Sequence, residues 1–182
     1  NGAFFLMDNF NFMNYFGKPR TGPVKEYSSY VFKSDTKDMY AYFLKMGTVK
    51  NTLSDKYFNH QSYIWDEYIQ HDTYNEYWKA RNIRTHLKNI TIPTLIVGGW
   101  FDAEDLYGPL NIYKTIEANS PAAYNTLVMG PWGHGDWARE QGKSTHNHIY
   151  FGDSIATFYQ REIEAKFFAY YLKGEGQPKL PE

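Results

Sequence analysis

Residues 92–105 read IPTLIVGGWFDAED, and residues 92–97 of this segment form a short, continuous apolar run. A run of this length that stops at a glycine pair, Gly98-Gly99, is typical of a strand buried on both faces of a parallel sheet. Asp102 follows the glycines, at the carboxyl end of the predicted strand. Because functional side chains of open α/β sheets lie on loops at that end, Asp102 is a candidate functional acid.

The chain continues with a predicted helix and a second predicted strand. The helix has Pro109 in its first turn and an apolar face made by Leu106, Leu110, Tyr113 and Ile116. Residues 125–129 (NTLVM) are the second strand, which stops at Gly130-Pro131. His134 lies in the loop after it, so an acid follows one strand and a histidine follows the next.

The remaining pattern is helical on both sides of these strands. A final helix is predicted from Asp153 or Ser154 to Gly174, because apolar residues recur there every four positions. Residues 1–87 show helical spacing without an alternating strand pattern: one helix is capped at Ser34-Asp35 and ends at Gly47, and another is broken near Asp72. The sequence predicts an α/β fold in which helical residues 1–88 precede an α/β region at 89–182.

Aromatic residues make up 19% of the chain, with 17 Tyr, 13 Phe and 5 Trp, and many lie in the first 80 residues. Two interpretations remain open. The rings pack as a helical layer over a site, or they form a binding surface for sugar or peptide in a module without catalytic activity. Ring placement distinguishes them, because a binding platform needs several rings exposed in one plane.

Charge and composition exclude several classes of partner. The 182 residues contain 19 Lys and Arg and 20 Asp and Glu, and no basic block that could follow a phosphate backbone or an anionic bilayer. No apolar run approaches the roughly 20 residues that span a bilayer. The absence of cysteine excludes disulfides, thiolate metal sites and a cysteine nucleophile. We expect no nucleic acid, membrane, metal or cofactor as a partner.

The order of the two candidate residues is that of α/β-hydrolases, in which Ser, Asp and His follow one another along the chain. In such a triad the carboxylate orients the imidazole, and the imidazole takes the serine proton and returns it to the leaving group. A single histidine in a glycine-rich loop is more often incidental. The paired placement predicts that an Asp102 oxygen lies roughly 2.6 to 3.2 Å from a His134 ring nitrogen.

The residues of these motifs resemble those of a known family. The string at residues 92–105, followed by MGPWGHG at residues 129–135, closely resembles the α-amino acid ester hydrolases. That family is similar to the cocaine esterases, the X-prolyl dipeptidyl peptidases and the enzymes named glutaryl-7-aminocephalosporanic acid acylases. The resemblance continues through residues 151–153 and 167–174, more weakly through residues 1–4, and is specific from about Ile92 onward.

The resemblance implies roles for individual residues. Asp102 matches the acid of the triad and His134 matches its base. Glu104 and Asp105 match carboxylates that hold the free α-ammonium group of the substrate, and Trp100 and Tyr107 are assigned to the same substrate-binding region. A substrate with a free α-amino group, either a small molecule or a peptide, is therefore expected. As an alternative, acids at the start of a helix complement its dipole.

The chain departs from the family in lacking a Gly-x-Ser-x-Gly motif. The nearest string, at residues 152–156 (GDSIA), lacks the second glycine and is better explained as a helix cap. The resemblance implies a fragment: residues 1–88 as a helical cap and 89–182 as the C-terminal part of a hydrolase sheet domain, without the nucleophile segment and the later jelly-roll. Alone, we expect it to be inactive, and its open strand edges predict either self-association into homo-oligomers or marginal stability.

Two sequence patterns could indicate a metal site. A calcium loop starting at Asp102 fails because Tyr107 and Tyr113 occupy the positions that require Gly and Glu. His146 and His148 would lie on one face of a strand, but no third ligand is evident nearby. No metal is predicted.

Overall fold

The computed structural model describes residues 6–32, 36–139 and 144–177. The chain divides into two compact units, Asn1–Arg81 and Asn82–Glu182. The predicted cap at Ser34-Asp35 and the resemblance at residues 1–4 lie outside the described residues. No helix in the described ranges has the length and the apolar character needed to cross a membrane.

The described part of the first unit is helical, as its sequence predicts. Its elements are α1 (Leu6–Phe16), α2 (Met39–Met46), the 3-10 helix η1 (Val49–Leu53), α3 (Tyr63–Gln70) and α4 (Glu76–Ala80). The N-cap of α2 is Asp38, whose carboxylate accepts the backbone N–H of Ala41. The break predicted near Asp72 separates α3 from α4.

Aromatic side chains form the core of this unit. The buried residues are Phe10, Met13, Tyr42, Phe43, Met46, Phe58 and Trp65. The Phe10 ring packs against five others, among them Phe43 at 5.5 Å and Phe58 at 5.1 Å between ring centroids. Trp65 is fully buried and donates its indole N–H to Thr52 Oγ1 at 2.7 Å. This arrangement favours packing over a flat binding platform as the reason for the aromatic content.

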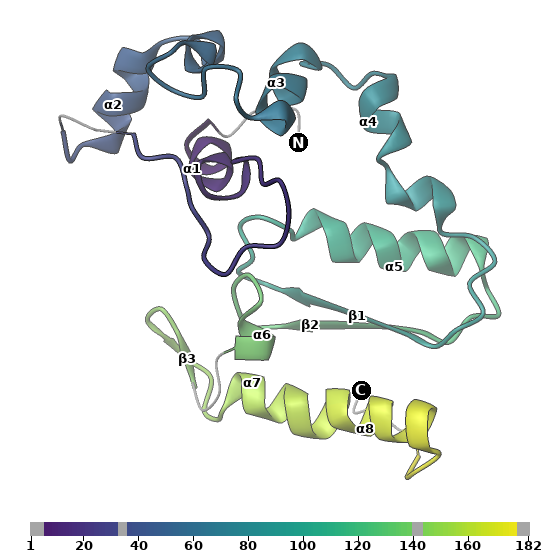
Figure 1. Cartoon of the computed structure of the whole chain (residues 1–182). Helices are drawn as coiled ribbons and strands as arrows, with labels where there is room; N and C mark the ends of the chain where they lie inside the picture. Colours follow the sequence, from purple (N-terminus) through teal and green to yellow (C-terminus); the bar gives the residue numbers. More distant parts are fainter. Residues whose placement is uncertain (1–5, 33–35, 140–143, 178–182) are drawn as a thin grey trace. The chain divides into compact units, whose positions relative to one another are not determined.

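The second unit is built on two parallel strands, β1 (Thr94–Gly99) and β2 (Asn125–Gly130) (Figure 1). The register aligns Thr94 with Asn125 and Gly99 with Gly130, so both strands end at the same level. The long helix α5 (Tyr107–Asn119) connects them, and the 3-10 helix η2 (Ile83–His86) precedes β1. The loops that carry Asp102 and His134 therefore leave the sheet side by side.

Helices cover both faces of the strand pair (Figure 1). A side chain at Gly98 would meet Pro109, so this side of β1 faces α5. Leu95, Val97 and Val128 point to the other face, where they pack around the buried residues Trp132, Tyr159 and Ile163. Burial on both faces explains the continuous apolar run of β1, as the sequence predicts.

The second face is covered by one helical run that ends the described chain. It consists of α7 (Ile155–Phe158), a π-helical segment η3 (Tyr159–Glu164), α8 (Ala165–Phe168) and a second π-helical segment η4 (Ala169–Lys173). Gly174 ends it in the left-handed conformation with φ +71°, which confirms the predicted stop. A short helix, α6 (Asp136–Arg139), and the strands β3 (Thr145–His146) and β4 (Ile149–Tyr150) lie between β2 and this run in the sequence.

Candidate active site

Backbone hydrogen bonds hold the loops after β1 and β2 together. The N–H of Trp100 donates to the Gly130 carbonyl at 2.8 Å, and the N–H of Phe101 donates to the Trp132 carbonyl at 3.2 Å. These bonds extend the parallel ladder past the last strand residues. The backbone that carries Asp102 is thereby fixed relative to the backbone that leads to His134.

Trp132 anchors the second loop in the core. The residue is 3% exposed, and its indole N–H donates to the Gly98 carbonyl at 3.1 Å. A Cβ atom at Gly99 or Gly130 would collide with Trp132, so glycine at both strand ends leaves the space for the indole. The glycines that mark the strand ends in the sequence therefore have a packing role beside the functional loops.

The structure brings Asp102 and His134 into contact, as the sequence predicts. His134 Nδ1 lies 3.1 Å from Asp102 Oδ2 and 3.3 Å from Oδ1. The Asp102 side chain is 2% exposed and the His134 side chain 45% exposed. Asp102 Oδ1 also accepts the backbone N–H groups of Glu104 at 2.9 Å and Asp105 at 2.8 Å. A buried, oriented acid thus holds one ring nitrogen of a histidine that remains open to solvent.

Glu104 and Asp105 place two more carboxylates beside the imidazole. Glu104 Oε2 lies 4.0 Å from His134 Nε2, and Asp105 Oδ2 lies 3.6 Å from His134 Nδ1. Their side chains are 62% and 66% exposed, so both can reach a ligand in the solvent. These acids place one further negative charge near each ring nitrogen of His134.

A pocket of about 430 Å³ opens beside Asp102 and His134. It is lined by Asp102, Asp105 and His134, together with residues of β1, α5 and α6 such as Ile96, Pro109 and Trp137. The predicted substrate-binding residues Trp100, Glu104 and Tyr107 do not line it. Trp100 is 54% exposed, and the Tyr107 hydroxyl accepts a hydrogen bond from Arg84 at 3.2 Å.

The surroundings shift the pKa values of both paired residues. Burial opposes the charged carboxylate of Asp102, but the N–H groups of Asp105 and Glu104 and the His134 ring outweigh it and hold the pKa of Asp102 below its usual value. Burial also opposes the imidazolium of His134, but the hydrogen bond and charge of Asp102, with the charges of Glu104 and Asp105, raise its pKa above 6.5. The surroundings therefore stabilise the charged form of each residue relative to its ordinary pKa.

This shift predicts a pH-dependent stability. Because the folded-state pKa of His134 is raised, its stabilising contribution is complete below about pH 6.5 and is lost as pH rises through the folded-state pKa. We expect the free energy of unfolding of the unaltered protein to fall relative to that of His134→Gln across this window. Urea unfolding at a series of pH values measures this difference, and an NMR titration of the His134 ring locates the pKa. A difference that is constant across the window would contradict the prediction.

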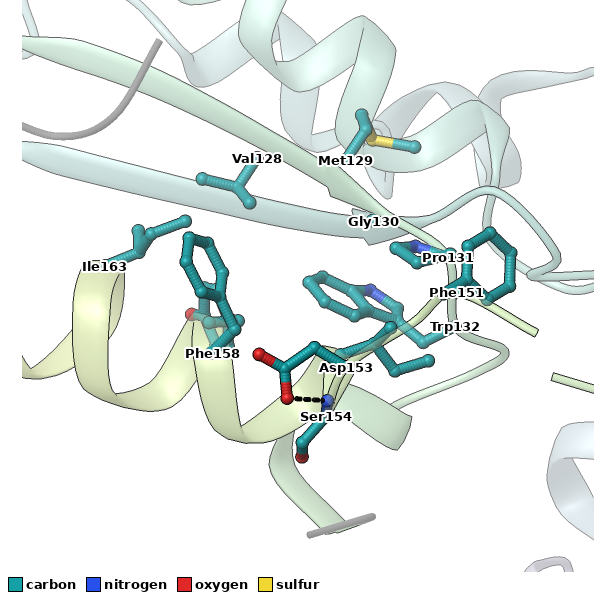
Figure 2. Close-up of a pocket in the computed structure, with 12 residues that line it drawn as sticks. Val128, Met129, Gly130, Pro131, Trp132, Phe151, Asp153, Ser154, Phe158 and Ile163 are labelled. Carbon is teal, nitrogen blue, oxygen red and sulfur yellow. Dashed lines mark hydrogen bonds between the residues drawn. The ribbon is translucent and has the colours of Figure 1, made fainter. Parts of the chain in front are cut away.

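A second pocket, of about 270 Å³, lies between β2 and the C-terminal helical run (Figure 2). Apolar side chains dominate its lining, among them Val128, Trp132, Phe158 and Ile163. Ser154 lies at this pocket, and its N–H donates to Asp153 Oδ1 at 2.6 Å (Figure 2). Ser154 occupies the predicted N-cap position of α7, but its side chain makes no capping hydrogen bond, and it lines a different pocket from His134.

The structure corrects one alternative for a metal site. The sequence suggested His146 and His148 on one face of a strand, but β3 ends at His146, and Asn147 turns the chain with φ +51°. The His146 ring instead stacks on Phe101, with centroids 4.5 Å apart. Within residues 6–32, 36–139 and 144–177, no group of three or more His, Asp or Glu side chains is arranged to hold a metal ion.

The sequence pattern does not predict two side chains that contact the loop around His134. Arg139 Nη2 donates to the His134 carbonyl at 2.6 Å, and Asp136 Oδ2 accepts the Gly133 N–H at 3.2 Å. Both belong to α6, a four-residue helix too short to produce a hydrophobic pattern. A charged residue two or five positions after a glycine-flanked histidine is too common to mark such contacts.

A parallel α/β sheet with an acid and a histidine on neighbouring strand-end loops is the arrangement of α/β-hydrolase-type enzymes. Solved structures support this fold. An aminopeptidase from a marine sediment archaeon, Thaumarchaeota archaeon, superposes with a TM-score of 0.82 at 24% identity, over 99% of this chain and 28% of its own. An α-amino acid ester hydrolase superposes with a TM-score of 0.81 at 22% identity, again over 99% of this chain and 28% of its own. The chain therefore spans 28% of the length of each of these structures.

The sequence identifies the family. The model of the X-Pro dipeptidyl-peptidase (S15 family) matches residues 24–136, more than half of the chain. The chain belongs to this family, which confirms the resemblance stated from its motifs. A search of the curated proteins finds no significant match.

Proposed function

We propose that this chain supplies the acid and the base of a serine hydrolase. The observation that carries the proposal is the contact between buried Asp102 and half-exposed His134, 3.1 Å apart, on neighbouring strand-end loops. Asp102 accepts the Nδ1 proton and keeps Nε2 free to act as the base. The family and the folds of its structural neighbours support a hydrolase.

The nucleophile of the proposed reaction is a serine outside this chain. The 182 residues contain no Gly-x-Ser-x-Gly motif, and the matched structures are much longer than this chain. His134 Nε2 takes the proton of that serine as its oxygen attacks the substrate carbonyl, and returns it to the leaving alcohol or amine. Water then cleaves the acyl-enzyme with His134 again as the base.

We propose esters, amides or peptides with a free α-amino group as substrates. The names of the family and of the two neighbours, an X-Pro dipeptidyl-peptidase, an aminopeptidase and an α-amino acid ester hydrolase, share this substrate chemistry. Glu104 and Asp105 lie within 4.0 Å of the His134 ring, where carboxylates can receive an α-ammonium group next to the reacting carbonyl. In this proposal residues 1–88 act as a helical cap, and residues 89–182 are the end of the hydrolase sheet domain.

The test uses a polypeptide that joins this chain to its native upstream segment. We expect hydrolysis of an α-amino acid ester or of an X-Pro dipeptide anilide, and one-to-one labelling by a fluorophosphonate that reacts with activated serines. The isolated 182-residue chain should show neither. Hydrolysis by the isolated chain that depends on His134 would refute a serine outside it, and a hydrolytic polypeptide that the fluorophosphonate does not label would refute the serine class.

A further inference from the structure

Two side chains of α6 hold the loop that carries His134. Asp136 Oδ2 accepts the N–H of Gly133 at 3.2 Å. Arg139 Nη2 donates to the His134 carbonyl at 2.6 Å, and its Nε donates to the Gly135 carbonyl at 3.3 Å. The backbone on both sides of His134 is therefore bonded to charged side chains of the helix that follows it.

Gly135 makes the approach of Arg139 possible. Its φ of +71° is a conformation that side-chain-bearing residues rarely adopt, and a Cβ atom there would meet the Arg139 guanidinium. The guanidinium contacts two successive carbonyls from one planar group. A lysine ammonium is a single point charge without this fork, so Lys at position 139 cannot reproduce both bonds with the same geometry.

Different interactions hold Asp102 and His134 in place. Asp102 is buried and receives backbone N–H groups from its own loop. The His134 ring is 45% exposed, and its loop leaves the core after the buried Trp132. The bonds from α6 therefore set where the His134 backbone lies relative to Asp102. Because a shift of about 1 Å in a catalytic group can cost roughly 100-fold in rate, this placement matters for the reaction.

We propose that Arg139, together with Asp136, is a positioning residue for His134, which acts through the His134 backbone without touching the substrate. This inference rests on the proposed function, in which His134 is the base. Asp136 restrains the loop before His134 and Arg139 restrains it at and after His134. The result is a histidine whose Nδ1 stays within reach of Asp102 while Nε2 remains open.

The test compares Arg139→Lys and Arg139→Ala in the polypeptide that joins this chain to its native upstream segment. We expect kcat to fall about 10- to 100-fold in both, with KM changed less than about threefold, because orientation of the base is lost and substrate contacts are kept. We also expect the NMR signal of the His134 Nδ1 proton to broaden or shift. Added guanidinium at millimolar concentration should partly restore kcat to Arg139→Ala but not to Arg139→Lys. The matched control is Arg161→Ala, which removes an exposed arginine from η3.

The readouts separate the two proposals. If the unaltered polypeptide shows no hydrolysis that depends on His134, the proposed function fails, whereas the Nδ1 signal still decides whether Arg139 positions the ring. Unchanged kcat together with an unchanged Nδ1 signal in the Arg139 variants overturns the positioning role. A loss of kcat that guanidinium does not restore, with an unchanged Nδ1 signal, also overturns it. If Arg139→Ala does not fold, Arg139→Lys carries the same comparison.

Discussion

In the polypeptide that joins this chain to its native upstream segment, replacing Asp102 by asparagine is expected to lower kcat about 10⁴-fold. The reason is that the His134 ring would carry its proton on Nε2 and not on Nδ1. Asp102 Oδ1 accepts the N–H groups of Glu104 and Asp105, so the asparagine carbonyl must take this place. Its NH₂ group then occupies the position of Oδ2, 3.1 Å from His134 Nδ1. A donor at that point requires Nδ1 to be the acceptor, which moves the ring proton to Nε2. A protonated Nε2 cannot take the proton of the serine.

The measurement is kcat for an α-amino acid ester, with thermal unfolding of each variant to verify that it folds. Asp72→Asn, which neutralises an exposed aspartate in the first unit, is the matched control and should retain full activity. Adding His134→Ala to Asp102→Asn should lower kcat much less than the single changes together predict, since the two residues act as one unit. A loss below tenfold in a folded Asp102→Asn variant would remove Asp102 from the triad.

The sheet of the second unit was predictable because its pattern and its topology agree. Apolar runs that stop at glycine pairs or at Gly-Pro predict buried strands, and the helix between them makes a parallel pairing the natural arrangement. β1 begins at Thr94, two residues later than the apolar run, because Pro93 has no N–H for the ladder. The contact of Asp102 with His134 follows from this sheet, since the strand ends align at Gly99 and Gly130.

Other features depend on packing that has no local pattern. The sequence predicts one helix to Gly174, but its π-helical segments η3 and η4 are not visible in the spacing of apolar residues. The sequence predicts substrate binding by Trp100, Glu104, Asp105 and Tyr107, whereas only Asp105 of these four lines the pocket with His134. The bonds from Arg139 depend on the positive φ of Gly135. A glycine in the sequence permits this conformation but does not predict it.

Replacing Glu104 by glutamine and Asp105 by asparagine together is expected to change substrate preference. In the proposed complex the α-ammonium group of the substrate approaches these solvent-exposed carboxylates, which lose water when the substrate covers them. Loss of a desolvated charge pair costs about 2 to 5 kcal/mol, so kcat/KM for an α-amino ester should fall roughly 30- to 4,000-fold. The matching ester without the amino group should change less than about threefold.

Two features of the site shape this experiment. The same carboxylates raise the pKa of His134, so their removal also moves the acid limb of the pH profile to lower pH. Both esters must therefore be compared at a pH well above that limb, where His134 is neutral in every variant. The matched control is Glu26→Gln with Asp55→Asn, which removes two exposed acids from the first unit. Equal losses on both esters would mean that the two carboxylates act on the catalytic pair itself, through their charges beside His134, and do not select the substrate.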